Sequence, residues 1–122
     1  MSLTQFTENL LNYLSDVGRI KLGPRQNEAP PIICVNIDGS ASRIGATSQI
    51  VYNYRVIFDI YAVSRRQADE ISILIIRKFL KDWATLLDNY GWDVHSFGRI
   101  MDLEQEQGIV HRVLECEIRV IG

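Results

Sequence analysis

Two histidines are the side chains best suited to acid–base chemistry in this sequence, and neither has the neighbours that such chemistry needs. His95 and His111 lie far apart in the last third of the chain. A catalytic histidine is usually oriented by a second polar group, and a metal-binding histidine needs further ligands at a regular spacing. Neither pattern occurs beside His95 or His111. We interpret both as residues of a sheet surface, and we predict no catalytic residue and no metal site.

Other reactive side chains also lack the partners that would give them a role. Cys34 and Cys116 each lie inside an apolar, strand-like run, without the close spacing of a metal or redox motif, so we interpret both as buried, reduced thiols. The acids of DLEQE, at Asp102, Glu104 and Glu106, could supply an acid and a base, but acids at a hairpin tip are usually solvated turn residues. We predict no cofactor.

Length and composition predict one globular domain. The chain has 122 residues, of which 47% are hydrophobic and 23% are charged, enough for one two-layer core and too little for two. The net charge is −2 and the basic residues are scattered, so no surface is predicted to neutralise a nucleic-acid backbone. No apolar run approaches the roughly 20 residues of a membrane span. We expect one domain over residues 1–122, of cytoplasmic origin and without a membrane partner.

The first part of the chain predicts a helix, a connecting arm and a buried strand. Apolar residues recur at helical spacing before the stop signal Gly18, at Phe6, Leu10, Leu14 and Val17. Residues 19–31 contain the turn formers Gly23, Pro24, Pro30 and Pro31, which favour an irregular arm. Residues 32–37, IICVNI, are rich in β-branched side chains and predict a short strand that is buried on both faces.

A strand and a helix follow each other closely in the middle of the chain. The strand alternates with period two, and its apolar face holds Tyr52, Tyr54, Val56, Phe58 and Ile60. Ser64 precedes Gln67 by three positions, the spacing of a capping box in which each side chain bonds the amide of the other residue. The helix therefore starts there, and it continues to Tyr90-Gly91 with a break allowed near Trp83.

The last third predicts a hairpin whose turn lies in residues 104–108. In its second arm Leu114, Cys116, Ile118 and Val120 point to one face, and Val113, Glu115, Glu117 and Arg119 to the other. One face of the sheet is therefore solvated or covered by something polar. The order helix, strand, strand, helix, strand, strand predicts an α+β fold, with a mainly antiparallel sheet of about four strands and two helices packed on one face.

The long helix carries more apolar surface than one contact needs. Nine of its residues cover an arc of about 180°, where a stripe of about 100° is enough for one core contact; they are Ile73, Ile75, Ile76, Phe79, Leu80, Trp83, Ala84, Leu86 and Leu87. The first helix could bury the excess, or another copy of the chain could. We assign Ile73, Ile76, Leu80 and Trp83 as a candidate oligomer interface.

A small, polar segment is the candidate for contact with a partner protein. Residues 38–49, DGSASRIGATSQ, contain two glycines and few side chains that could pack, so we expect a flexible loop. Within it we assign Ser40, Arg43 and Ile44 as candidate partner-contacting residues. The hypothesis is that this loop becomes ordered only against a neighbouring ring or tube.

The arrangement of these segments resembles the tail terminator and tail-completion proteins of long-tailed bacteriophages and prophages. The similarity spans most of the chain and includes an aromatic and aliphatic strand that ends in an aspartate, a helix with Ala-Asp near its start, and a final strand that begins with His-Arg. The matching residues are Asp59, Ala62, Ser64, Ala68, Asp69, Glu70, His111 and Arg112. Residues 23–31 and the segment LLDNYGWDV match no motif of that family.

The resemblance implies a structural protein of the virion tail. Such a domain assembles into a ring, commonly of six subunits, that caps the tail tube and offers a surface to the head connector. The implied partners are other copies of the chain, the tail tube protein and the head connector protein, with DNA only as passing cargo. The implied location is the head–tail junction, after assembly in the cytoplasm of the host bacterium.

Two alternative functions stay open from the sequence. The chain could be another component of a virion or a tube, such as a connector or a baseplate adaptor built on a related domain. It could also be a small-molecule-binding α+β domain, whose site would lie between helix and sheet. The sequence supplies no convergent polar groups for such a site.

Overall fold

The computed structural model describes residues 3–43, 50–103 and 108–121. Along the chain the elements are α1 (Leu3–Tyr13), β1 (Ile20–Leu22), β2 (Ile32–Arg43), β3 (Ile50–Ala62), α2 (Arg65–Lys81), α3 (Trp83–Tyr90), β4 (Trp92–Leu103) and β5 (Val110–Ile121). The fold is α+β, as the sequence predicts. The described residues form five strands and three helices, where about four strands and two helices were predicted.

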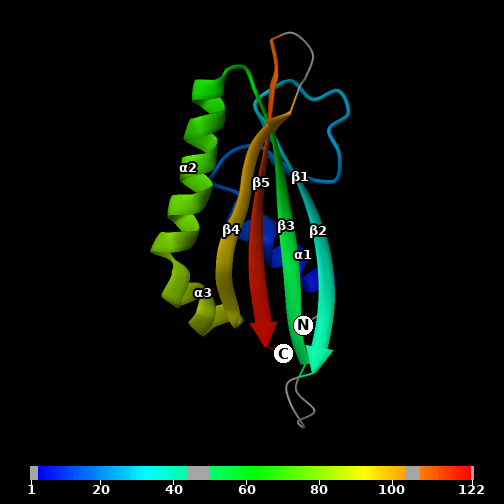
Figure 1. Cartoon of the computed structure of the whole chain (residues 1–122), viewed down its shortest axis with the longest axis vertical. Coiled ribbons are helices and arrows are strands. Elements are labelled where there is room, and N and C mark those ends of the chain that lie inside the picture. The colour runs from blue at the N-terminus through cyan, green and yellow to red at the C-terminus, as the bar shows by residue number, and fades with distance from the viewer. Residues whose placement is uncertain (1–2, 44–49, 104–107, 122) are drawn as a thin grey trace.

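The strands form one mixed sheet in the order β1-β2-β3-β5-β4. All neighbouring pairs are antiparallel except β1 with β2, which are parallel. The three helices contribute to one core on one side of the sheet, and Figure 1 shows α1 behind β3 and β5, with α2 and α3 beside β4. We call the side of the sheet that carries no helix the open face; at one end of it Arg25 lies over the ring of Tyr61.

The core lies between the helices and the alternating inward residues of the strands. β3 contributes Tyr54, Val56, Phe58 and Ile60, and β5 contributes Leu114, Cys116, Ile118 and Val120. The helices add Phe6, Leu10, Ile75, Phe79 and Leu86, and Leu14 follows directly after α1. These residues are fully or almost fully buried. The period-two and period-3.6 patterns of the sequence therefore identify the core face of both long inner strands and of all three helices.

The predicted start of the long helix is confirmed. The backbone amide of Gln67 donates to the Ser64 hydroxyl at 3.1 Å. The Gln67 side chain accepts at 2.8 Å from the backbone amide of Val63. The predicted donor to this side chain was the amide of Ser64, so the prediction is wrong by one residue. The predicted end is also confirmed, because Gly91 caps α3 in the left-handed conformation.

The break allowed near Trp83 is confirmed, and the prediction of an irregular arm needs a correction. Lys81 ends α2 and Asp82 separates it from α3, where the hydroxyl of Tyr13 donates to both the Lys78 carbonyl and the Asp82 carboxylate. These bonds give the backbone at the junction partners outside its own helix. Within the predicted arm, Ile20–Leu22 forms β1, since it finds the edge of β2 to pair with.

The prediction of a loop over residues 38–49 is wrong for its first half. Asp38–Arg43 continue β2 and pair in register with Arg55–Ile50 of β3. The segment lacks apolar side chains, but β3 supplies them, and Gly39 lies against the ring of Tyr54. Pairing with a strong strand therefore overrides a weak local preference. Residues 44–49 lie outside the described part of the chain.

The predicted hairpin is confirmed in its two arms. β4 and β5 pair antiparallel, with register shifts between Val94 and Arg99 that indicate β-bulges. The alternation in β5 is as predicted on the inner side, while on the open face Val113 is 9% exposed. The predicted turn falls on residues 104–107, which lie outside the described part, and on Gly108.

Candidate functional site

The outer side of α2 and α3 exposes large apolar side chains. Leu80 is 63% exposed, Trp83 47% and Ile73 45%. Ile76, the fourth residue of the predicted interface, is only partly exposed and packs against the core. We call Ile73, Leu80 and Trp83 the outer flank. The structure brings these residues to the surface, as a contact with another molecule requires.

The first helix does not cover the outer flank, because it packs on another side of α2. The hydroxyl of Tyr13 donates to the Lys78 carbonyl at 3.0 Å and to the Asp82 carboxylate at 2.9 Å. The ammonium of Lys78 lies 2.7 Å from Asp16, just beyond α1. Lys78 and Leu80 are about 160° apart around a helix. The excess apolar arc predicted from the sequence is therefore shared, with one side facing α1 and the other facing solvent.

Two of the three predicted partner-contacting residues lie in the described part of the chain, and both belong to β2. Ser40 lies on the open face of β2 and is exposed. Arg43 is the last residue of β2. Ile44 lies outside the described residues. Ser40 and Arg43 therefore belong to the edge strand β2 and not to a loop.

A long part of β2 has no neighbouring strand on its outer side within the described chain. The Ile33 amide donates to the Arg19 carbonyl, and the Gly23 amide donates to the Val35 carbonyl. Odd-numbered residues of β2 therefore direct their backbone polar groups away from β3. β1 pairs only as far as Val35. The amides and carbonyls of Ile37, Gly39 and Ala41 thus lie at a free edge.

The opposite edge of the sheet is β4. In an antiparallel sheet the backbone polar groups of successive residues point alternately to the two neighbouring strands. When this alternation is followed from β2 through β3 and β5, Met101 directs its backbone polar groups to Val113 of β5. Ile100 and Asp102 therefore direct theirs away from the sheet. Residues 99–103 pair regularly with β5, while the bulges lie before Arg99. Bulges are a common protection of an edge strand, so the regular part is the more accessible one.

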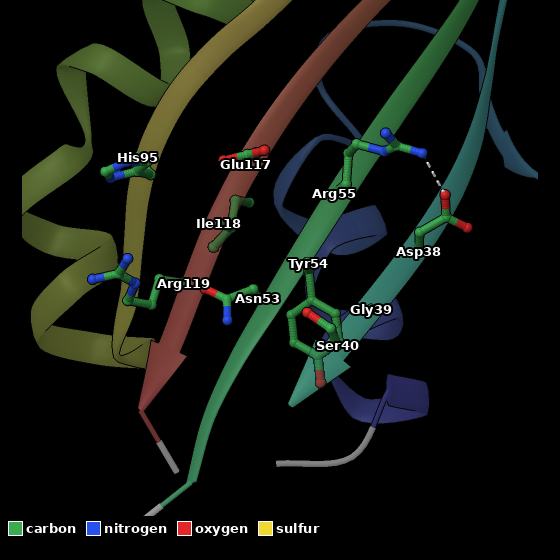
Figure 2. Close-up of a pocket in the computed structure, with 10 residues that line it drawn as sticks. All are labelled: Asp38, Gly39, Ser40, Asn53, Tyr54, Arg55, His95, Glu117, Ile118 and Arg119. Atoms are coloured by element: carbon green, nitrogen blue, oxygen red, sulfur yellow. Dashed lines mark hydrogen bonds and ion pairs between the residues drawn. The ribbon is translucent and has the colours of Figure 1, made fainter. Parts of the chain in front are cut away.

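The open face carries charged and polar side chains around a depression of about 320 Å³. Asp38, Arg55 and Glu117 follow one another across three strands, and Figure 2 shows the Asp38 carboxylate directed at the Arg55 guanidinium, 2.9 Å away. His95 and Arg119 lie at the β4 side of the same depression. The charges alternate in sign, and no single anion or cation is favoured there.

The two histidines have different environments. His95 is exposed on β4. His111 is 8% exposed, its Nε2 atom lies 2.7 Å from Asp59, and its ring stacks on Tyr61. Asp59 is 52 positions away from His111 in the sequence, so no local spacing reveals this pair.

The two cysteines are free and buried, as predicted. Burial raises the pKa of the Cys116 thiol to about 12, with a further contribution from Glu117. Burial also raises the pKa of Cys34. A thiol must lose its proton to act as a nucleophile or a metal ligand, so both side chains are held in their unreactive form at neutral pH.

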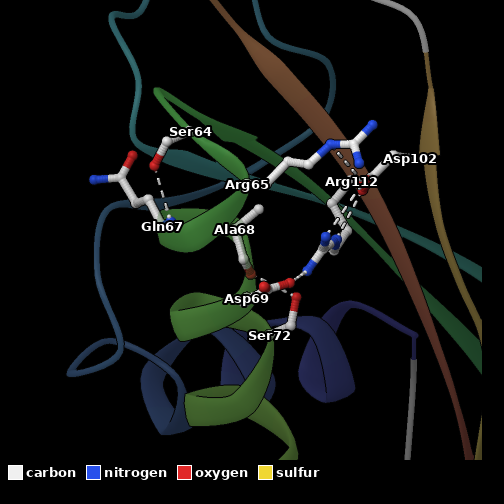
Figure 3. A network of polar contacts seen from close by, with 8 residues as sticks. All are labelled: Ser64, Arg65, Gln67, Ala68, Asp69, Ser72, Asp102 and Arg112. Carbon is white, nitrogen blue, oxygen red and sulfur yellow. Dashed lines mark hydrogen bonds and ion pairs between the residues drawn. The ribbon is translucent and has the colours of Figure 1, made fainter.

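A largely buried arginine joins the start of α2 to the sheet (Figure 3). The side chain of Arg112 is 11% exposed; its Nε atom donates to Asp102 at 2.8 Å, and Nη1 donates to Asp69 of α2. The bond from Arg112 lowers the pKa of Asp102. Residues of the phage-like pattern thus meet in two pairs, Asp59 with His111 and Asp69 with Arg112. Both pairs connect elements of the fold.

Two further observations concern the residues that the structure describes. No three His, Cys, Asp or Glu side chains lie together as a metal site would require, within residues 3–43, 50–103 and 108–121. No helix in the same ranges is both long and apolar enough to cross a bilayer.

Comparison with known proteins gives no family for this chain. No family model matches it, and no curated protein is found as a relative. Its function must therefore be inferred from its residues and their arrangement.

The free edge of β2 was not predicted from the sequence. The signal was present in the run of small residues from Gly39 to Ser42, which is typical of a loop but equally of a strand whose neighbour approaches closely. The pairing that decides between the two is formed with Ile50–Arg55, on the far side of residues 44–49.

Proposed function

We propose that this chain is a structural protein of a phage or prophage tail, which forms a ring that caps the tail tube and joins it to the head connector. The observation that carries the proposal is the outer flank, where Leu80, Trp83 and Ile73 remain exposed although α1 packs beside α2. Closing a ring requires two different surfaces on each subunit, and the opposite edge of the sheet, at β2, supplies the second. The subunit number would be six if the chain follows the family that it resembles.

The composition of the open face also suits this role. Among the side chains that the structure describes, the part of this face around the depression has more acidic than basic residues. The acids are Asp38, Asp93, Glu115 and Glu117, and the bases are Arg55 and Arg119. A weakly acidic surface repels DNA phosphates, so a lumen lined by it would let the genome pass without binding. No residue of this surface needs to perform a reaction in the proposed role.

Electron microscopy of the purified chain tests the proposal. We expect rings of one defined symmetry, and a mass by light scattering that is the matching multiple of 14.0 kDa. Addition of the tail tube protein should give capped tubes of limited length. A chain that stays monomeric at all concentrations and with tubes present would contradict the proposal, and a melting temperature that rises with a small ligand would favour a binding domain instead.

Replacement of exposed polar residues in a phage that carries the gene gives a second test. His95→Ala and Glu115→Ala remove the side chains of the open face most suited to proton transfer. We expect parental tail length and infectivity for both variants. A large loss of infectivity in a variant that still folds and forms rings would revive a catalytic role.

A further inference from the structure

We infer that the ring closes by strand addition, with β4 of one copy pairing antiparallel to the free edge of β2 in the next copy. The inference rests on the proposed ring and specifies its contact. Within the described part of the chain, both edges carry backbone groups without a strand partner, at Ile37, Gly39 and Ala41 on β2 and at Ile100 and Asp102 on β4. Such edges are templates for another strand.

The directions of the strands allow this contact in a ring. β2 and β4 run antiparallel to each other within the sheet, because three antiparallel pairings separate them. All subunits of a cyclic ring point the same way along its axis. With the strands inclined to that axis, β4 of one copy therefore meets β2 of the next copy in antiparallel orientation, and five-stranded sheets join into one continuous wall.

The geometry of closed sheets gives the alignment. A barrel of eight strands with a shear of eight has a strand tilt of about 36°, so the register moves by about one residue per strand. Four strands, β2, β3, β5 and β4, separate one free edge from the other. Neighbouring copies should therefore be displaced by about four residues along the strands. Within one subunit Met101 is level with Cys34, through Val113 and Asp59. The free part of β2 lies beyond Val35, so a displacement of four residues in that direction places Met101 of one copy opposite Asp38 of the next.

This displacement agrees with three independent features. It places the outward backbone groups of Ile100 opposite those of Gly39, and those of Asp102 opposite those of Ile37, which can pair in the antiparallel pattern. Without displacement Ile100 would meet Val35, whose carbonyl already accepts from the Gly23 amide. Ile100 is 53% exposed, and opposite it Gly39 has no side chain in the way.

The hand of the sheet then decides which face lines the lumen. Neighbouring strands of a sheet are rotated in one sense by its right-handed twist. If the helices face outwards, this twist displaces β4 of one copy towards the Arg43 end of β2 in the next copy, where the free edge lies (Figure 1). If the helices faced inwards, the displacement would be towards the other end of β2, which β1 covers. The helices therefore face outwards, and the open face with Asp38, Glu115 and Glu117 lines the channel.

Cross-linking tests the register. The two residues of a non-hydrogen-bonded antiparallel pair have Cα atoms about 4.5 Å apart, within the range of a disulfide. We expect Asp38→Cys with Met101→Cys to give a ladder of oxidised oligomers up to the full ring on a non-reducing gel. Asp38→Cys with Ser96→Cys is the matched control, since Ser96 is level with Asp38 in the undisplaced sheet. Each single variant controls for the native thiols Cys34 and Cys116.

The outcomes separate the inference from the proposed function. Rings of the parent chain with a ladder only in the Asp38 and Met101 pair support both. Rings with a ladder in the Ser96 pair, or in neither, overturn the strand addition and leave the ring standing. Absence of rings in the parent overturns both.

Proline at the free edge gives a test without oxidation. Ala41→Pro removes an amide that faces solvent in the isolated subunit, where proline is tolerated, but that faces β4 of the neighbour in the ring. We expect Ala41→Pro to stay folded and to lose its rings, while Ala41→Val, which keeps the amide, retains them. Rings of Ala41→Pro in parental yield would overturn the inference.

Discussion

The Nε2 atom of His111 lies 2.7 Å from Oδ1 of Asp59, across the diagonal between β5 and β3. The other carboxylate oxygen of Asp59 accepts from Asn36 of β2 at 3.2 Å, and the ring of His111 stacks on Tyr61 with centroids 4.3 Å apart. One carboxylate thus connects three neighbouring strands at the top of the open face. His111, one of the two histidines considered for acid–base chemistry, is thus held in place by contacts within the sheet.

Removal of the carboxylate should therefore reduce stability. Asp59→Ala leaves the nearly buried His111 nitrogen without its acceptor, and we expect the free energy of unfolding to fall by about 1–3 kcal/mol. His111→Phe keeps the stack on Tyr61 while removing the bond. A double-mutant cycle in urea should give a coupling energy of about 1 kcal/mol or more between the two positions. Additive single effects would show that the pair does not act as a unit.

The Arg112 network predicts a dependence on acid. The bond from Arg112 holds the pKa of Asp102 below its ordinary value of 3.8, so the folded state favours the charged carboxylate. The stabilisation is present above pH 3.8 and is lost as the pH falls through the lower pKa of the folded state. Arg112→Met should destabilise the fold at pH 7, and the difference from the parent should shrink below about pH 4. Urea titrations of parent and variant at pH 7 and pH 3 measure this difference, and a gap of equal size at both would contradict the argument.

The exposed flank predicts a variant that separates assembly from folding. Leu80→Asp places a charge on a side chain that is 63% exposed, so the isolated subunit should keep its melting temperature while an interface there would be disrupted. Leu74→Asp is the matched control, since Leu74 is 53% exposed and lies about 120° away around the helix. We expect light scattering to show smaller particles for Leu80→Asp alone. An equal loss in both variants would mean that the flank is not the contact.

The structure explains why some of the fold could be predicted from the sequence. Segments with strong local patterns were assigned correctly, including the alternation of β3, the cap at Ser64 and the stop at Gly91. Each of these depends on residues within a few positions of one another. The inward faces of β3 and β5 follow from the same local information.

The remaining features depend on distant partners. β1 has three residues, too few for a periodic pattern, and it exists because β2 offers an edge. The composition of Asp38–Arg43 is typical of a loop, and the segment forms a strand because it pairs with the part of β3 that contains Tyr52 and Tyr54. The pairs of Asp59 with His111 and of Asp69 with Arg112 join residues 52 and 43 positions apart, which no local spacing reveals.

The contact between Gly39 and Tyr54 predicts that a side chain at position 39 lowers stability. A Cβ at Gly39 would lie 3.0 Å from two ring atoms of Tyr54, and this ring is itself stacked on Phe6 in the core. We expect Gly39→Ala to lower the free energy of unfolding by about 1–3 kcal/mol, the usual cost of overpacking. Gly98→Ala is the control, because a Cβ there meets nothing within 4 Å. Parental stability of Gly39→Ala in urea would show that the ring can move aside.

The hydroxyl of Tyr13 predicts a dependence on alkali. Burial, followed by the bond to Asp82, raises the pKa of Tyr13 above its ordinary value of 10.0, so the folded state favours the protonated phenol. Its stabilisation is fully present below pH 10 and is lost as the pH rises towards the raised pKa of the folded state. Tyr54 and Tyr61 have raised pKa values through burial as well, so only part of the alkaline loss belongs to Tyr13.

Tyr13→Phe isolates that part. The variant loses the bonds that join α1 to the junction of α2 and α3, and at pH 7 we expect a loss of about 1 kcal/mol in the free energy of unfolding. Above pH 10 the parent should weaken more steeply than the variant, so their urea midpoints should converge. Tyr90→Phe, at a side chain that is 38% exposed, controls for the loss of a phenol from the surface and should keep the parental urea midpoint at pH 7. Parallel curves for Tyr13→Phe and the parent would show that the hydroxyl bonds do not hold the helices together.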